Sequence, residues 1–266
     1  TRGGRLSSAA GSCAFLLLPL LPRRGPALLS RLRFLLLLLV RLRGWVPDVL
    51  EALGVNLEIS EDEFRDCLDG AGVAFLFARS HHSAMRHVAP VRAKLGIRTI
   101  FNLLGPLTNP AGACHQVLGV FAPEWTRPMA ETLNRLGTER AWVVHGLDGI
   151  DELSIAGASK VCEVRDGAVT EFEVHPSDAG LSTHPLSALE SEDVAGNALA
   201  ITELLDGHET PFREAVLLNA AAGLLVHGKA TDLKTGAAMA AEVIDSGKAK
   251  QTLRKLVTLS RGEPLE

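Results

Sequence analysis

The pattern of apolar and polar positions predicts four short strands in the middle of the chain. The stretches "HQVLGVF" (115–121) and "RAWVVHG" (140–146) are typical of buried strands. The stretch "KVCEVRDGAVTEFEV" (160–174) is typical of a hairpin, because Asp166-Gly167 is a pair that favours a tight two-residue turn. A strand at 115–121 and further strands from 140 onward indicate one sheet.

Helical spacing and helix-stop residues predict the elements around these strands. Apolar positions over 124–136 predict an amphipathic helix that Gly137 ends, and the chain from about Glu192 onward is helical in pattern. Strands alternating with helices, then a helical tail, indicate an α/β fold with helices covering a central sheet. The other predicted elements are a helix over 48–53 ended by Gly54, a strand at 55–59, a helix over about 61–69 with a Ser60–Glu63 capping box and a stop at Gly70, a buried strand or turn at 73–78, and helices at 81–88 and 90–96.

Composition is that of a globular chain with a sizeable core. The chain has 266 residues, 47% of them hydrophobic, and 25 glycines, which favours an α/β protein over a disordered or fibrous one. The four cysteines are scattered without a CxxC pair or metal-ligand spacing. We therefore expect reduced thiols in an intracellular protein.

The charge is unevenly distributed along the chain. Residues 1–47 hold eight arginines and no acid, so the net charge of −4 leaves −12 for residues 48–266. An acidic main body argues against a nucleic-acid-binding surface over most of the protein.

The first 47 residues differ in character from the rest, and three interpretations stay open: an aberrant segment, a targeting peptide, and a real but unusual folded segment. The longest apolar run, Phe34 to Val40, has seven residues, whereas a membrane span needs about 20. Arginine without acids fits a targeting peptide, although serine is sparse. Fifteen leucines among arginine, proline and glycine also fit out-of-frame translation of GC-rich DNA, and we expect an aberrant segment from a frame or gene-model error.

The stretch "HHSAMRHVAPVRAKLGIRTIFNLLGPLTNP" (81–110) combines cations and imidazoles with two rigid turns. Its first eighteen residues include three histidines, three arginines and a lysine, and it ends in Gly105-Pro106 and Asn109-Pro110. A pocket for an anionic ligand is one interpretation, and a solvated helix face followed by a loop is the other.

The stretch "VVHGLDGIDELS" (143–154) places carboxylates directly after a predicted buried strand. Asp148, Asp151 and Glu152 follow His145-Gly146, and Gly149 lies between the first acid and the other two. Ligands bind at this end of strands in open α/β sheets, and adjacent carboxylates are suitable for Mg²⁺ held largely by water and phosphate. An acidic surface turn, with His145 as a core histidine, is the alternative. Together with stretch 81–110, the pattern suits metal-assisted transfer on a phosphorylated substrate.

Three stretches together resemble the anthranilate phosphoribosyltransferase family. They are 75–121, 143–154 and "AVLLNAAAGLLVHGKA" (215–230), and the resemblance covers about residues 48–258. It implies a nucleoside-phosphorylase or type III phosphoribosyltransferase-like α/β fold, cytoplasmic or plastid location, homodimers, Mg²⁺ as cofactor, and no nucleic-acid or membrane partner. The implied reaction transfers phosphoribosyl from phosphoribosyl pyrophosphate to the anthranilate amine.

The resemblance also implies roles for five residues. Arg92 matches the arginine that binds the anthranilate carboxylate, His82 a histidine along the anthranilate path, and Pro106 a proline wall near its ring. Asp151 and Glu152 match the acidic pair that binds Mg²⁺ with the pyrophosphate. No enzyme nucleophile, and so no catalytic residue in that sense, is implied, because the attacking amine belongs to the substrate.

Three family motifs are missing before Asp48. The glycine-rich "GTGGD", the "N.ST" stretch and "KHGNR..SS", which cradle phosphates in the family, do not occur in residues 1–47. We therefore expect three parts: an aberrant segment 1–47, a glycosyltransferase-type α/β domain 48–258 without most of the small helical domain, and a tail 259–266. We also expect impaired activity and doubtful dimerisation.

Two rival functions and one non-functional outcome stay open at this point. A nucleoside phosphorylase-like enzyme would share the fold, but the "GPL.NP" wall and Arg92 argue against it. A non-enzymatic, nucleic-acid-binding homologue is disfavoured by the charge of residues 48–266. A poorly folding, inactive product would expose apolar surface and aggregate.

Overall fold

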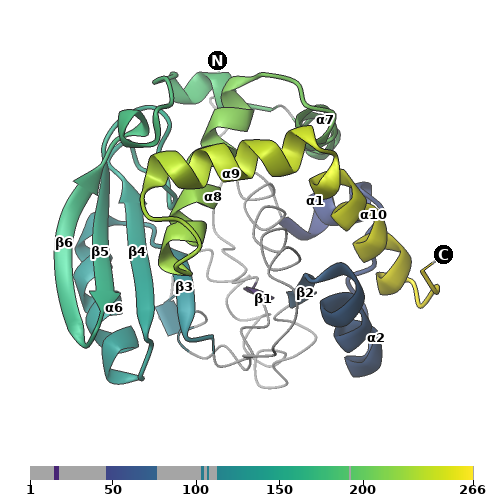
Figure 1. Cartoon of the computed structure of the whole chain (residues 1–266), viewed down its shortest axis with the longest axis horizontal. Coiled ribbons are helices and arrows are strands. Elements are labelled where there is room, and N and C mark those ends of the chain that lie inside the picture. Colours follow the sequence, from purple (N-terminus) through teal and green to yellow (C-terminus); the bar gives the residue numbers. More distant parts are fainter. Residues whose placement is uncertain are drawn as a thin grey trace, which may run out of the picture.

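The computed structural model describes residues 15–17, 46–76, 103–104, 107, 113–191 and 193–265. Figure 1 shows a sheet on one side of the molecule and helices that cover it and extend to the other side. The helices predicted at 81–88 and 90–96 lie outside the described residues. Within the described ranges, no helix combines the length and apolar character needed to cross a membrane.

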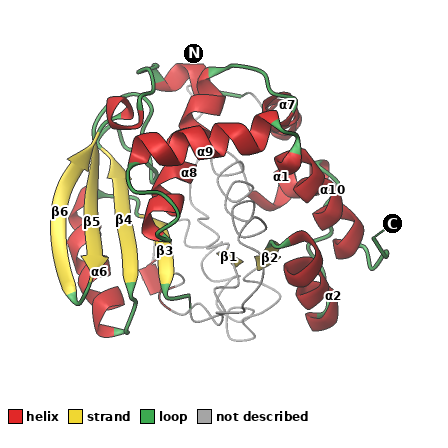
Figure 2. Cartoon of the chain, in the orientation of Figure 1, coloured by secondary structure: helices red, strands yellow, loops and turns green. Residues whose placement is uncertain are grey.

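The central sheet has four strands in the order β3-β4-β5-β6, as Figure 2 shows in yellow. Strand β3 (His115–Gly119) is parallel to β4 (Arg140–Gly146), while β5 (Ser159–Arg165) and β6 (Ala168–Val174) continue the sheet in antiparallel register. The predicted hairpin is confirmed: Asp166 and Gly167 have φ values of 52° and 77°, and the left-handed conformation of both residues matches the strand twist.

Both faces of β4 are covered, which explains its continuous apolar run. Ala141 and Val143 pack with Met129 and other apolar residues of α6 (Thr126–Arg135). Trp142 and Val144 face the larger core on the opposite side, which includes the apolar residues of α8 (Pro211–Val226). A strand whose two faces are both buried needs apolar residues at every position, so its sequence does not alternate between apolar and polar residues. The α6 prediction is confirmed, with Gly137 at φ 85° just after the helix.

Four helices form the predicted C-terminal part. They are α7 (Val194–Leu205), α8, α9 (Leu233–Asp245) and α10 (Lys248–Ser260). Helix α8 is buried almost all round, and α9 packs directly against it (Figure 1). A Cβ on Gly236 would lie 2.8 Å from Cα of Ala221, so the two helices approach too closely for any larger residue there.

The remaining elements are short and lie before and around the sheet. Three residues of β1 (Phe15–Leu17) pair antiparallel with β2 (Ala74–Leu76), the strand expected at 73–78. The others are helix α1 (Val46–Ala52), helix α2 (Glu61–Asp66), the π-helix η3 (Cys67–Ala71), and the 3-10 helices η4 (Pro123–Trp125), η5 (Pro176–Ala179) and η6 (Leu186–Leu189).

The strand predicted at 55–59 is wrong. Asn56 instead organises the segment: its backbone N–H donates to Ser260 Oγ at 3.0 Å, and its Oδ1 accepts the backbone N–H of Glu58 at 3.1 Å. Side chains therefore form hydrogen bonds with backbone groups that, in a strand, would bond to a neighbouring strand.

The capping box of Ser60 and Glu63 is confirmed, but the helix does not stop at Gly70. It continues as η3 to Ala71, and Gly72 at φ 77° follows as the left-handed stop. A Cβ on Gly70 would lie 2.7 Å from Leu259 Cδ1. Gly70 thus allows a close approach to α10 and is not a cap.

Candidate functional site

The loop over residues 147–158 joins β4 to β5 at the carboxyl end of β4 and carries the three predicted acids. It opens with a tight turn in which the Gly149 N–H donates to the Gly146 carbonyl at 2.8 Å. Gly149 has φ 101°, a conformation that favours glycine. The sequence prediction of a loop directly after a buried strand is confirmed.

Hydrogen bonds close this loop on itself. The Leu147 N–H donates to the Ala158 carbonyl at 3.0 Å. The Ser154 hydroxyl donates to Asp148 Oδ2, and the Ser154 N–H donates to Ser159 Oγ at 2.7 Å. Asp148 therefore organises the loop, and its side chain is engaged within it.

Gly146 is enclosed by the loop it begins. A Cβ at this position would lie 2.7 Å from Asp148 Oδ1 and 2.8 Å from Ile150 Cγ1. Such separations are shorter than ordinary van der Waals contact, so the loop can fold back over the strand end only because Gly146 has no side chain.

Asn219 of α8 holds the loop through hydrogen bonds to its backbone. Its Oδ1 accepts the Leu153 N–H at 2.9 Å, and its Nδ2 donates to the Leu153 carbonyl at 2.9 Å and to the Ala215 carbonyl at 3.0 Å. Asn219 is 2% exposed and Leu153 1% exposed. The residue next to Glu152 is thus held at both backbone groups by a buried side chain.

The two acids matched to a metal role differ in exposure. Glu152 is 5% exposed, whereas Asp151 is half-buried and makes no hydrogen bond or ion pair within the described ranges. Ligand atoms of Asp148, Asp151 and Glu152 do not all lie within 4.8 Å of one another. The donor set is hard oxygen on a rigid loop. It fits Mg²⁺, which binds through one or two carboxylates and keeps water and phosphate as its other ligands.

His145 is a buried core histidine. It is 4% exposed, and its Nδ1 donates to the Val120 carbonyl at 2.8 Å, which ties the end of β4 to the residue after β3. The alternative interpretation of this histidine in the sequence is therefore confirmed.

Arg92, His82 and Pro106 lie outside the described residues, so their predicted roles stay predictions. Among the described residues, sequence reasoning did not identify Asn219 or Ser154. A single asparagine within the apolar run 215–226 was the available signal for Asn219, because a buried amide requires bonded partners.

Comparison with known proteins places the chain in one family. Residues 44–250 match the glycosyl transferase family a/b domain. The chain is 62% identical over 214 residues to the anthranilate phosphoribosyltransferase of Hyphomonas neptunium, covering 80% of this chain and 63% of that protein. It is 53% identical over 212 residues to that of Rhodospirillum rubrum, covering 80% and 61%. The chain thus spans less than two thirds of the length of these curated relatives.

Solved structures of the same kind superpose on the chain. Anthranilate phosphoribosyltransferase from Thermus thermophilus matches with a TM-score of 0.77 and 46% identity, covering 88% of this chain and 73% of that one. The Saccharomyces cerevisiae enzyme in complex with PRPP and Mg matches with a TM-score of 0.76 and 27% identity, covering 88% and 69%.

Proposed function

The chain belongs to the glycosyl transferase family with this a/b domain and, within it, to the anthranilate phosphoribosyltransferases, and on that basis we propose that its reaction is phosphoribosyl transfer to anthranilate. In this reaction the bond between the sugar carbon and pyrophosphate breaks, a carbon–nitrogen bond to the anthranilate amine forms, and the amine loses a proton. The substrate supplies the nucleophile, so the protein contributes positioning and electrostatic stabilisation.

The acidic pair on loop 147–158 is the observation that supports this function most directly. Asp151 and Glu152 would hold Mg²⁺, and the loop is already fixed by Asn219 and by the closing bonds of Ser154. When bound, Mg²⁺ would neutralise negative charge on the departing pyrophosphate. A rigid loop keeps the two carboxylates in place without an ordering cost at the moment of binding.

We propose that the anthranilate side of the site comes from stretch 81–110. Arg92 would bind the substrate carboxylate through its guanidinium, His82 would line the path of the aromatic ring, and Pro106 would form a wall of its pocket. The support is the family motif at these positions and the Saccharomyces cerevisiae structure in complex with 4-fluoroanthranilate.

We further propose that the 266-residue chain turns over slowly. Residues 1–47 contain none of the "GTGGD", "N.ST" and "KHGNR..SS" motifs that would cradle the phosphates. We extend the proposal to a cytoplasmic location, and we propose that homodimer formation, a property of the family, is weakened in this chain.

Two parallel assays test this function. The full chain is incubated with phosphoribosyl pyrophosphate, Mg²⁺ and anthranilate, and product and pyrophosphate are quantified. The same assay is run on a graft in which residues 48–266 follow the corresponding N-terminal part of the Hyphomonas neptunium relative. We expect equimolar product and pyrophosphate from the graft and much slower formation from the full chain.

A folded graft that forms no product would contradict the proposed reaction. A full chain as fast as the graft would contradict only the proposal that residues 1–47 limit turnover.

A further inference from the structure

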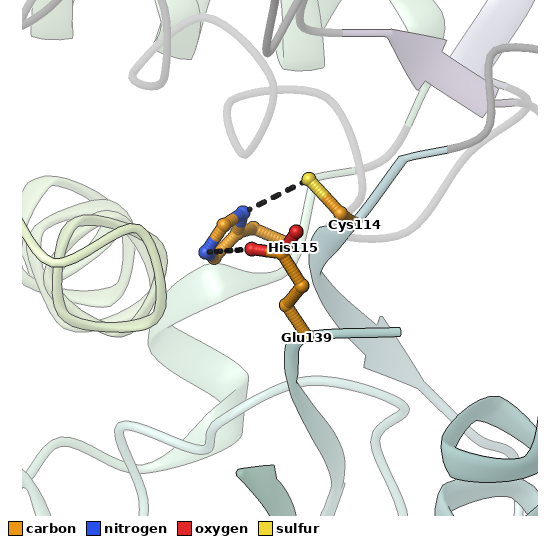
Figure 3. Close-up of side chains that lie close together, drawn as sticks. All are labelled: Cys114, His115 and Glu139. Atoms are coloured by element: carbon orange, nitrogen blue, oxygen red, sulfur yellow. Dashed lines mark hydrogen bonds and ion pairs between the residues drawn. The ribbon is translucent and has the colours of Figure 1, made fainter. Parts of the chain in front are cut away.

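A second group of metal-binding side chains gathers at the amino ends of β3 and β4 (Figure 3). Cys114 directly precedes β3, His115 begins it, and Glu139 directly precedes β4. Cys114 Sγ lies 3.2 Å from His115 Nδ1, and His115 Nε2 lies 3.8 Å from Glu139 Oε2. One ligand atom from each residue lies within 4.8 Å of the other two.

The backbone holds these three residues together independently of their side chains. The N–H groups of Glu139 and Arg140 both donate to the Cys114 carbonyl, at 3.0 and 3.1 Å. The cluster therefore follows from the parallel pairing of β3 with β4, although the two segments are distant in sequence.

The nearby arginine is engaged elsewhere and does not neutralise Glu139. Arg140 bonds Glu163 at 2.9 Å and donates to the Leu225 carbonyl at 2.7 Å. The Glu139 side chain is 69% exposed and the His115 side chain 24% exposed, so both can be reached from solvent. The cluster thus combines a thiol, an imidazole and an exposed carboxylate.

A second histidine reaches the same place from helix α8. His227, the C-cap of α8, has its ring centroid 5.5 Å from that of His115, at an edge-to-face angle of 79°. Its Nδ1 is buried and has no hydrogen-bond partner among the described residues.

We propose that Cys114, His115 and Glu139 form a binding site for a divalent transition metal such as Zn²⁺, with His227 as an additional ligand. One sulfur, one or two imidazoles and one carboxylate are a donor set typical of Zn²⁺ and unsuited to Mg²⁺. Typical Zn–S and Zn–N bonds in tetrahedral geometry place sulfur and nitrogen roughly 3.6 Å apart, close to the spacing of Cys114 and His115. Binding would deprotonate the thiol and release that proton to solvent.

This site is separate from the proposed magnesium loop. It lies where β4 begins, at Arg140, whereas loop 147–158 follows the end of β4 at Gly146. A metal there would join β3, β4 and the end of α8, so it would stabilise the sheet without taking part in the transfer reaction.

Titration of the full chain with Co²⁺, followed by absorption, tests this site. We expect one Co²⁺ per chain and a thiolate-to-cobalt charge-transfer band that Zn²⁺ removes by displacement. The band should disappear in Cys114→Ser and persist in Cys13→Ser and Cys67→Ala, which are matched cysteine controls. His227→Gln should keep the band and weaken binding by about tenfold.

Three results would overturn the proposal. The first is the absence of a thiolate band in the parent chain, and the second is a band that survives Cys114→Ser. The third is Co²⁺ binding by His227→Gln as tight as that of the parent chain, which would show that His227 is not a ligand. If Cys114→Ser does not fold by circular dichroism, Glu139→Gln and its control Glu131→Gln replace it. Affinity should then fall several-fold only in Glu139→Gln.

Discussion

The side-chain amide of Asn219 bonds both backbone groups of Leu153. Its Oδ1 accepts the Leu153 N–H and its Nδ2 donates to the Leu153 carbonyl, each at 2.9 Å. The two residues lie 66 positions apart in the chain. Helix α8, which has no predicted contact with substrate, thereby sets the position of the residue adjacent to Glu152.

Asn219→Ala should lower the free energy of unfolding by about 2–4 kcal/mol, because it leaves the buried N–H and carbonyl of Leu153 without partners. Urea unfolding measures this loss. The control is Asn134→Ala, which removes one exposed bond to the Gly167 carbonyl and should cost at most about 1 kcal/mol. An equal decrease in the free energy of unfolding in the two variants would show that the bonds to Leu153 contribute no more stability than one exposed hydrogen bond.

Gly146→Ala should destabilise the protein by about 1–3 kcal/mol, because the added methyl group would meet Asp148 and Ile150 at less than 3 Å. Gly157→Ala lies in the same loop, has no heavy atom within 4 Å of its Cβ position, and should change stability by about 0.5 kcal/mol or less. Thermal unfolding of both variants measures the difference. A Gly146→Ala protein as stable as Gly157→Ala would contradict the close packing of the loop.

His227 should make the metal-free protein less stable in acid. Burial, together with the charges of His115 and Lys229, lowers the pKa of His227 in the folded state below its ordinary value of 6.5. The unfolded chain therefore binds the proton more readily. The stabilising contribution is present above about pH 6.5 and is lost as the pH falls through the folded-state pKa.

Urea unfolding between about pH 7.5 and pH 5.5, with a chelator present, measures this dependence. We expect the free energy of unfolding to fall toward the acid end, and to fall less in His227→Gln. The exposed His208→Gln is the control and should keep the parent slope. An unchanged slope in His227→Gln would rule out His227 as the source.

Local signals in the sequence were sufficient to predict most strands of the sheet and the segments that connect them. The hairpin was predictable because Asp166-Gly167 can adopt two left-handed conformations in succession, and α2 because Ser60 and Glu63 cap its first turn reciprocally. The strand at 55–59 was mispredicted because Ser260, at the other end of the chain, supplies a bond that no local pattern reveals.

The same distinction holds for the candidate sites. The position of Asp151 and Glu152 after β4 could be predicted from a buried strand followed by glycines and acids. The support from Asn219 could not, since a contact between α8 and the loop depends on tertiary packing. The four cysteines showed no metal spacing, yet the pairing of β3 with β4 brings Cys114 to Glu139, because strands distant in sequence can be neighbours in a sheet.

We propose that Asp151 and Glu152 hold the Mg²⁺ used in phosphoribosyl transfer. The most direct measurement is the transfer rate of the graft as a function of Mg²⁺ concentration, for the parent, Asp151→Asn, Glu152→Gln and the exposed control Glu173→Gln. We predict that Asp151→Asn and Glu152→Gln each raise the Mg²⁺ concentration for half-maximal rate by about tenfold or more, which corresponds to about 1.4 kcal/mol of lost binding. Glu173→Gln should match the parent. An unchanged Mg²⁺ requirement in both acidic-pair variants would show that Asp151 and Glu152 do not hold the Mg²⁺.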